Sequence, residues 1–503
     1  MIRYSKIGAL LICLLAACLP GRVAGADPLA APGDLRLRHD LQLLADAGLL
    51  NIPLTTWPIP WGDIANNLAD EKDVHGAALL ASWRRIHHRI DIEFYSHLRL
   101  SSRLASAAFP VRFRTFTDTP RATLEAGAAV SLTRDRWAMH LEGAAVVRKP
   151  RDGKRWRPDG SYVSGILGNW IVSAGWQDRW WGPGWDGSLI MSTNSRPIPA
   201  ISIMRNASDP FDLPVLKWLG PWQIRFFQGV LEGNRFVPHG MLTGIRFSFK
   251  PTAGLEIGLS RAMQWGGRNR PHSLATFVRA LIGSDNTGKL GVTAANQPGN
   301  QLAGFDLRWR SPIGGNLPYA FYSQLIGEDA SSRAPAAYLG QFGVESWGDL
   351  GDSGASWRAH VEFARTTANL FSGDFHRLNV AYEHGVFRSG YRYYGRSIGH
   401  SIDGDARAIG LGAAVVDSRG GVWEGLFRTI RTNQDNVSPG TVKIPAEHVI
   451  SLQLRTIQQF GNNSVTLGVG VSRSRRALGA GKRITGYVTD SVLHTELQWS
   501  SAF

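Results

Sequence analysis

The last eleven residues, 493–503, alternate between apolar and polar side chains and end on an aromatic residue. In an extended strand, the more apolar side would carry Leu493, Thr495, Leu497, Trp499 and Phe503. The polar side would carry His494, Glu496, Gln498 and Ser500. The last strand of a bacterial outer-membrane β-barrel typically has one face toward lipid and one toward an aqueous interior, and it ends on an aromatic residue.

The same alternation recurs from Ile92 onward, and turn-like Gly, Asp, Asn and Pro clusters interrupt it every 10 to 15 residues or so. Examples are residues 111–116, 357–363 and 465–471. Backbone polar groups in lipid must all be paired, which a closed barrel achieves with strands. We therefore predict an all-β fold, a transmembrane antiparallel β-barrel over residues 91–503. About 18 strands are expected, and 16 is the other even number that the pattern allows.

Residues 1–26 have the features of a secretory signal peptide. Arg3 and Lys6 precede an apolar run over residues 7–19, and small residues lead up to Ala26. The alternative is lipidation at Cys18, because Leu-Ala-Ala-Cys has the form of a lipoprotein cleavage box. We favour the signal peptide, since a barrel that already faces lipid needs no acyl anchor.

The chain is strongly basic, with a formal charge of +15. Loss of Arg3, Lys6 and Arg22 with the leader leaves +12. Export to the outer membrane argues against nucleic acid as the partner. Acidic polysaccharide and the phosphates of lipopolysaccharide are the anionic partners that remain, and ordinary surface and lumen charge is the alternative. The oligomeric state is left open, because no interface can be read from an alternating pattern whose outer face is committed to lipid.

Residues 27–90 carry helical periodicity instead. Asp34 can cap a first helix that ends before Gly48, and a second helix is expected near Asp63. The third helix has an apolar face made of Leu79, Trp83, Ile86 and Ile90. We expect this segment to pack on the periplasmic side, below or inside the barrel. His87 and His88 point in different directions on that helix, and we predict no metal and no cofactor.

Two long interruptions break the strand pattern, at residues 179–221 and 266–301. Connections of this length are usually functional or folded into the lumen, so both are expected to be infolded loops.

The first interruption also carries motifs of unusual specificity. Residues 177–186 read Gln-Asp-Arg-Trp-Trp-Gly-Pro-Gly-Trp-Asp, and residues 192–199 read Ser-Thr-Asn-Ser-Arg-Pro-Ile-Pro. Supporting stretches lie at residues 40–48, 53–58, 204–206, 264–267 and 390–401. Together these resemble the Wzi-type capsule assembly proteins of the Gram-negative outer membrane. The resemblance implies a barrel of about 18 strands, a periplasmic helical bundle and lectin-like attachment of capsular polysaccharide.

Aromatic and polar residues of this interruption are candidate polysaccharide contacts. Flat rings that could stack on sugar C–H groups come from Trp180, Trp181 and Trp185. Hydrogen bonds and charge would come from Arg179, Asp186, Asn194 and Arg196. The alternative is structural: a rigid Gly-Pro-Gly turn and three tryptophans would lock an infolded loop across the lumen. The two roles are compatible.

A second candidate segment follows Gly390. In a strand, Tyr391 and Tyr393 share one side, and we expect them to join an aromatic girdle at the membrane interface. Arg392 and Arg396 share the other side and would be available to acidic sugars at the lumen or rim.

His400, Ser401, Asp403 and Asp405 suggest a hydrolase or a divalent-cation site. No Gly-x-Ser-x-Gly elbow precedes the serine, and the twelve-residue calcium loop is absent, so a polar turn is expected. We predict a binding protein rather than an enzyme. The alternative from another class is a diffusion channel for small anionic or sugar solutes.

Overall fold

The computed structural model describes residues 28–95, 98–134, 136–147, 154–281, 299–313, 318–331, 334–368, 370, 378–481 and 483–502. The signal peptide, the possible lipidation site at Cys18 and the terminal Phe503 lie outside these ranges. No helix within them is long and apolar enough to cross a membrane.

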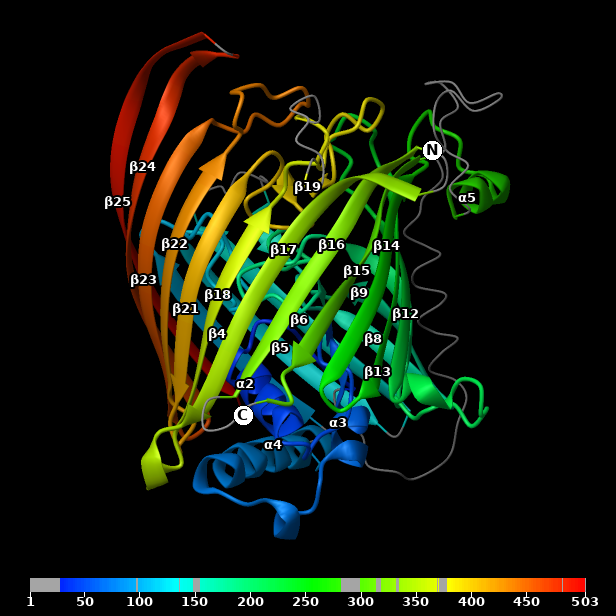
Figure 1. Ribbon diagram of the computed structural model, residues 1–503, viewed down its shortest axis with the longest axis vertical. Helices are drawn as coiled ribbons and strands as arrows, with labels where there is room; N and C mark the ends of the chain where they lie inside the picture. Colours follow the sequence, from blue (N-terminus) through cyan, green and yellow to red (C-terminus); the bar gives the residue numbers. More distant parts are fainter. Residues whose placement is uncertain are drawn as a thin grey trace.

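Antiparallel strands close into a barrel (Figure 1). Its wall is formed by β4 (Leu98–Ala107), β5 (Leu124–Arg134), β6 (Trp137–Val147), β7 (Trp156–Arg157), β8 (Tyr162–Leu167), β9 (Trp170–Trp176), β11 (Pro199–Arg205), β12 (Trp222–Val230), β13 (Met241–Thr252), β14 (Leu255–Trp265), β15 (Gly299–Arg310), β16 (Tyr319–Ser331), β17 (Ala334–Asp349), β18 (Ser356–Arg365), β21 (Arg407–Val416), β22 (Val422–Thr432), β23 (Glu447–Phe460), β24 (Asn463–Ala480) and β25 (Arg483–Ala502). The short β7 and the longer β8 both pair with β6, so together they occupy one strand position in the ring. Pairing of β25 with β4 closes the ring, and the expectation of 18 strands is confirmed.

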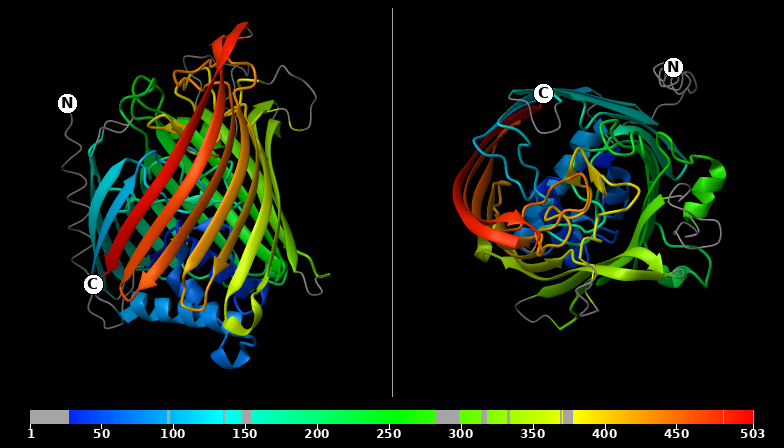
Figure 2. Two further views of the ribbon diagram at one scale, coloured as in Figure 1. Left: turned by 90° about the vertical axis from the view of Figure 1, so that its left-hand side faces the viewer. Right: turned by 90° about the horizontal axis from the view of Figure 1, so that it is seen from above.

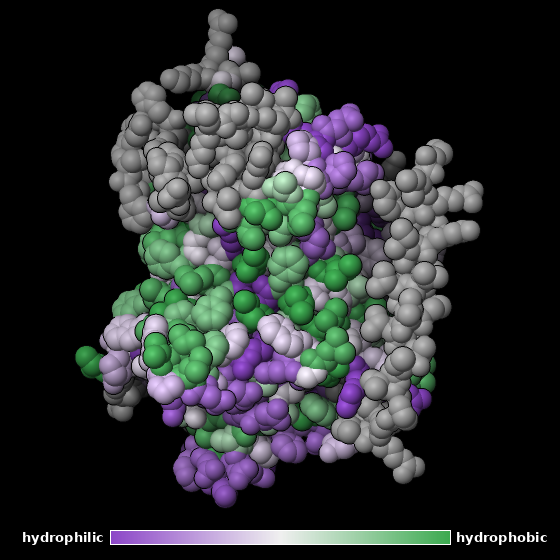
Figure 3. All heavy atoms as spheres, turned by 90° about the vertical axis from the view of Figure 1, so that its right-hand side faces the viewer, coloured by the Kyte–Doolittle hydropathy of each residue, from purple (hydrophilic) through white to green (hydrophobic). Residues whose placement is uncertain are grey.

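The alternation of side chains places apolar residues on the outside of the wall. On β25, Leu493 and Leu497 are 60% and 52% exposed, while His494 and Glu496 face the interior and are only half-buried. Figure 3 shows hydrophobic side chains over the middle of the opposite wall, with hydrophilic ones at its lower end. The pattern at the C-terminus therefore predicted the lipid-facing side of the last strand correctly.

The expected helices are present at one end of the barrel as α2 (Leu35–Asp46), α3 (Trp61–Asn67) and α4 (Ala77–Tyr95) (Figure 1). Asp34 caps α2 by accepting a hydrogen bond of 3.0 Å from the backbone N–H of Leu37. Most connections at this end are short, which identifies it as periplasmic, whereas long connections gather at the extracellular end. The predicted boundary after residue 90 falls inside α4, because Phe94 continues the apolar face at helical spacing.

The first long interruption is shorter than predicted. Strand β11 divides residues 179–221, so only the part before Pro199 enters the lumen from the extracellular end. Ile201 and Ile203 face outward in this seven-residue strand, which is too short to stand out from its irregular flanks. The part after Arg205 lies at the periplasmic end, where the backbone N–H of Ser208 donates to Asp63.

The expectation that residues 266–301 fold inward is wrong for the helix they contain. α5 (Leu274–Leu281) lies outside the ring (Figure 2). Its Phe277 ring packs 5.3 Å from Trp265 of β14, because the apolar face of α5 covers an apolar patch on the outer wall. Residues 282–298 lie outside the described residues.

Residues 111–116 alternate like a strand but form none. They belong to a connection between β4 and β5 that enters the lumen, where Phe113 and Phe116 are buried. In a filled lumen both sides of an extended segment find partners, so alternation does not require a place in the wall. Residues 357–363 and 465–471 lie in β18 and β24 as expected.

Candidate functional site

The lumen is filled from both ends. The chain between α2 and α3 carries the short strand β2 (Thr56–Trp57), and the loop after β9 carries β10 (Trp180–Trp181). These strands pair antiparallel inside the barrel, with Trp57 opposite Trp180. Seen from above, N-terminal helices and the loop before β21 occupy the middle of the ring (Figure 2). We call the N-terminal segment 28–60 and the loop 177–198 together the plug.

Buried charges join the plug to the wall. Asp46 at the end of α2 accepts hydrogen bonds from Arg308 (2.8 and 3.0 Å) and Arg358 (2.9 Å). Both arginines also bind Glu345, at 2.6 and 2.9 Å. Because removal of one member would leave buried charges unpaired, this cluster fixes α2 in the lumen.

The three candidate tryptophans are interior residues. Trp180, Trp181 and Trp185 are 0%, 1% and 6% exposed. Trp185 donates from Nε1 to Glu345 (2.8 Å), and the guanidinium of Arg38 lies 3.9 Å from the centre of a Trp185 ring. In this conformation the rings face the plug and the wall rather than solvent, which supports the structural alternative.

Arg179 and Asp186 are also buried within the barrel. Arg179 donates to the hydroxyl of Ser202 on β11 (2.9 Å). Asp186 lies 3.3 Å from Nε2 of His360. Burial alone would raise the pKa of Asp186, but its hydrogen bond to His360 and the charges of His360 and Arg428 hold that pKa below its ordinary value. Arg179 and Asp186, predicted as polysaccharide contacts, therefore contact residues of the wall and do not lie on the outer surface.

Asn194, Arg196 and Arg396 come together near the extracellular end. Arg396 donates from Nε to the carbonyl of Asn194 (3.0 Å) and from Nη2 to its side-chain oxygen (2.9 Å). Arg196 binds Asp159 through two bonds of 2.8 Å, and its guanidinium lies 5.4 Å from the Tyr394 ring centre. The structure thus joins two segments that the sequence predicted as separate contacts.

This meeting point is organised by a small hairpin, β19 (Arg392–Tyr393) and β20 (Arg396–Ser397). Gly395 at its tip is exposed, while Tyr394 and Arg396 are half-buried. We call Arg196, Tyr394 and Arg396 the outer cluster.

The girdle prediction for Tyr391 and Tyr393 is wrong, because they are 0% and 6% exposed. The hairpin belongs to a lumen loop and not to the wall, and Tyr391 donates its hydroxyl to the carbonyl of Ile190 (2.9 Å). Arg392 is likewise buried in ion pairs with Glu383 (2.6 Å) and Asp403 (2.8 Å). Those bonds hold the loop together and leave Arg392 no surface for acidic sugars.

The His400 region gives the hydrolase alternative no support. Within the described part of the chain, Nε2 of His400 and the hydroxyl of Ser401 each have no hydrogen-bond partner, and Asp403 is paired with Arg392. Burial lowers the pKa of His400 to about 4. Among the described residues, no group of three or more His, Cys, Asp or Glu side chains is placed to hold a metal ion.

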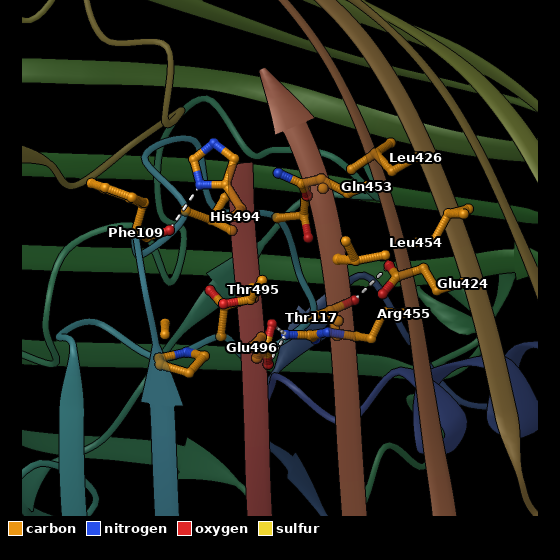
Figure 4. A pocket seen from close by; sticks show the side chains of 18 residues that line it. Phe109, Thr117, Glu424, Leu426, Gln453, Leu454, Arg455, His494, Thr495 and Glu496 are labelled. Atoms are coloured by element: carbon orange, nitrogen blue, oxygen red, sulfur yellow. Dashed lines mark hydrogen bonds and ion pairs between the residues drawn. The ribbon is translucent and has the colours of Figure 1, made fainter. Parts of the chain in front are cut away.

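A crevice lies beside the plug, between the inner faces of β22–β25 and the connection at residues 107–120 (Figure 4). Its unfilled space measures about 550 Å³ when the open solvent at its mouth is included. Arg455 and Glu496 form an ion pair across its floor at 2.5 Å, and Thr117 donates to Glu424 (2.9 Å). The sequence did not single out these residues, because they follow the ordinary alternation of strands. The only signal is a pair of inward-facing glycines on β24, Gly468 and Gly470, which leave room there.

A closed barrel with an apolar outer face and a lumen filled from both ends defines a plugged outer-membrane β-barrel protein. Residues 119–480 match the family model described as capsule assembly protein Wzi. This match covers most of the chain, which therefore belongs to the capsule assembly protein Wzi family.

Two similar proteins agree with this assignment. A solved structure of Wzi from Escherichia coli has 26% sequence identity and a TM-score of 0.78, and the match covers 94% of this chain and 98% of that one. That protein is described as a carbohydrate-binding β-barrel of the outer membrane involved in group 1 capsule assembly. An uncharacterized 55.8 kDa protein in the cps region of Klebsiella pneumoniae is 33% identical over 337 residues. That match spans 66% of this chain and 65% of the relative's length.

Proposed function

We propose that this protein binds capsular or a related extracellular polysaccharide at the extracellular end of its plugged barrel, and so retains the polymer at the cell surface. Family membership and the carbohydrate binding described for the Escherichia coli relative support the proposal. The observation that carries it is the outer cluster, where the half-buried Tyr394 ring and Arg396 guanidinium of one lumen loop meet Arg196 of another, which is 9% exposed.

The outer cluster has the chemistry that an acidic polysaccharide requires. The half-buried Tyr394 offers part of its ring for stacking on sugar C–H groups, and arginines donate paired hydrogen bonds to carboxylates. Arg196 and Arg396 are held by Asp159 and Asn194, so little side-chain freedom is lost when a sugar binds.

The crevice extends this surface. Arg396 also donates to the carbonyl of Arg112 (2.6 Å), and residues 109–120 form one side of the crevice. The connection between β4 and β5 therefore contacts the outer cluster and also lines the crevice. Glu424, Gln453 and Thr117 supply acceptors and donors for sugar hydroxyls there. Each contact is weak, but a repeating polymer engages many copies of the protein, and avidity provides retention.

The proposal is for binding rather than catalysis. Of the residues predicted from the sequence, Arg196 and Arg396 stay as proposed contacts. The scaffold that positions them contains Arg179, Trp180, Trp181, Trp185, Asp186, Asn194 and Arg392.

The test measures polymer binding by purified protein that carries Tyr394→Ala together with Arg396→Ala. We expect binding to fall about tenfold or more, since stacking and a charged hydrogen bond are lost at once. The matched control is Tyr95→Ala with Arg84→Ala, which removes an exposed tyrosine and an exposed arginine from α4 at the periplasmic end. Unchanged binding by a folded outer-cluster variant would refute this site.

A further inference from the structure

The outer wall carries a row of four arginines and one histidine at its extracellular end. Arg365 of β18 is the cross-strand partner of Arg407 on β21, which is in turn paired with Arg431 on β22. Arg431 lies opposite His448 on β23, and His448 lies opposite Arg475 on β24. Neighbouring strands are about 4.8 Å apart, so five basic side chains follow one another along the wall. We call the four arginines of this series the cation row.

The row faces outward. Arg407, Arg431 and Arg475 are exposed, and each occupies the same side of its strand as the lipid-facing residues. A band of apolar side chains lies four residues closer to the periplasmic end on the same strands and continues onto β25. Its members are cross-strand partners of one another. All are at least 40% exposed: Val361, Leu411, Phe427, Leu452, Val471 and Leu493. The strands concerned, yellow-green to red, face the viewer in the left panel of Figure 2.

Arg431, in the middle of the row, lies at the height of the outer edge of a membrane. On β22, the outward-facing Trp423 is 56% exposed and lies eight positions before Arg431. Eight residues span about 27 Å along a strand, or about 21 Å along the axis at a tilt of about 40°. The apolar band of an outer-membrane barrel is about 25 Å tall and is flanked by aromatic residues. Arg431 therefore lies where the headgroups of the outer leaflet begin, and the rest of the cation row crosses this level obliquely.

Acidic side chains do not balance this charge on the outer face. From the level of Trp423 up to the row, the outward positions of β21–β25 in the described residues contain neither Asp nor Glu. The carboxylates of Glu424, Glu447 and Glu496 all belong to inward-facing positions. Like charges directly opposite one another on paired strands destabilise a sheet, so the row favours an anion bound across it.

We propose that the cation row binds the phosphorylated sugar headgroup of lipopolysaccharide in the outer leaflet, while its acyl chains lie against the apolar band. Arginine donates in a planar fork that fits phosphate, and several arginines in register can hold two phosphates on one headgroup. The continuity of the row with a lipid-facing surface favours a lipid over a free polymer. The polysaccharide surface proposed above lies instead over the lumen.

The test uses the full-length protein in detergent micelles with purified lipid A as the probe, and bound lipid is counted by native mass spectrometry. The variant combines Arg407→Gln, Arg431→Gln and Arg475→Gln. We expect lipid A binding to fall about tenfold or more. The wild-type protein should bind dephosphorylated lipid A as weakly as the variant binds the phosphorylated form.

The matched control removes the same charge from exposed residues at the periplasmic end, with Arg84→Gln, Arg136→Gln and Lys217→Gln. It should bind lipid A like the wild type. A second readout is the unfolding temperature in lipid-free detergent, which should rise in the row variant because cross-strand repulsion is relieved. Equal lipid A binding by row variant and wild type would overturn the proposal. So would a row variant that loses acidic polysaccharide while it keeps lipid A.

Discussion

Trp57 and Trp180 face each other across a two-stranded sheet inside the barrel, although one enters from the periplasmic end and the other from the extracellular end. Phe116, from a third connection, contacts both rings, with centroids 5.2 and 5.3 Å away. The plug is therefore one packed structure, and disturbing either half should disturb the other.

The Asp46 cluster should dominate the attachment of the plug. Asp46→Ala removes one of the two carboxylates that Arg308 and Arg358 share, so two buried cations are left with Glu345. We expect a loss of about 3–5 kcal/mol in unfolding free energy. Asp70→Ala removes an exposed partner of Lys72 and should cost at most about 1 kcal/mol. Urea unfolding followed by gel mobility measures both, and equal effects would show that α2 is not held by this cluster.

Trp180 should act through packing. Trp180→Ala is expected to cost about 3–5 kcal/mol, whereas Trp218→Ala, at a ring that is 62% exposed, should change stability by less than about 0.5 kcal/mol. Trp180→Phe keeps most of the packing and should bind polysaccharide like the wild type. If this variant unfolds like the wild type but binds polymer weakly, the Trp180 ring contacts the polymer.

The filled lumen predicts an electrically silent protein. In a planar lipid bilayer, the wild type should show no steady conductance. Asp46→Ala combined with Glu256→Ala removes one acceptor that Arg308 and Arg358 share and the acceptor for the backbone of residues 54–55, so intermittent opening is expected. Steady wild-type conductance would instead favour the diffusion channel.

Sequence alternation predicted the barrel because lipid and lumen impose opposite demands on the two sides of each wall strand. The same rule failed for residues 111–116 and for Tyr391 and Tyr393. Alternation reports that the two faces of a segment differ, but it does not say whether the segment joins the wall. In a lumen filled by other chain segments, both faces can be buried.

The candidate site was predicted only in part for a related reason. The sequence alone does not distinguish a tryptophan that stacks on sugar from one that packs inside a plug, because the side chain is the same. The burial of Trp180 depends on Trp57 and Phe116, which are distant in sequence and were not expected to meet it. Arg196 and Arg396 were proposed as contacts from residue type, but their link through Asn194 required the fold.

Asp405 should make stability depend on pH. Burial raises the pKa of Asp405 to about 7, with neighbouring Asp435 and Glu383 adding to the shift. In the unfolded chain its pKa is about 3.9. The folded state therefore favours the protonated carboxyl, and stability should fall as pH rises from about 4 to about 7.

Asp405→Asn should flatten this dependence and stabilise the protein above pH 7 by at most about 4 kcal/mol, since one pKa unit corresponds to about 1.4 kcal/mol. Unfolding midpoints at several pH values measure the effect. A variant with the wild-type slope would show that Asp405 is ionised in the folded protein throughout this range.

Polysaccharide retention is tested most directly by comparing cell-attached with released polysaccharide in the producing organism. A strain without the gene is complemented with the wild type, with Tyr394→Ala and Arg396→Ala, or with the Tyr95→Ala and Arg84→Ala control. We predict unchanged total polymer in all strains, with release into the medium in the deletion and outer-cluster strains only. Full attachment in the outer-cluster strain, at wild-type levels of folded protein, would show that the outer cluster does not retain the polymer.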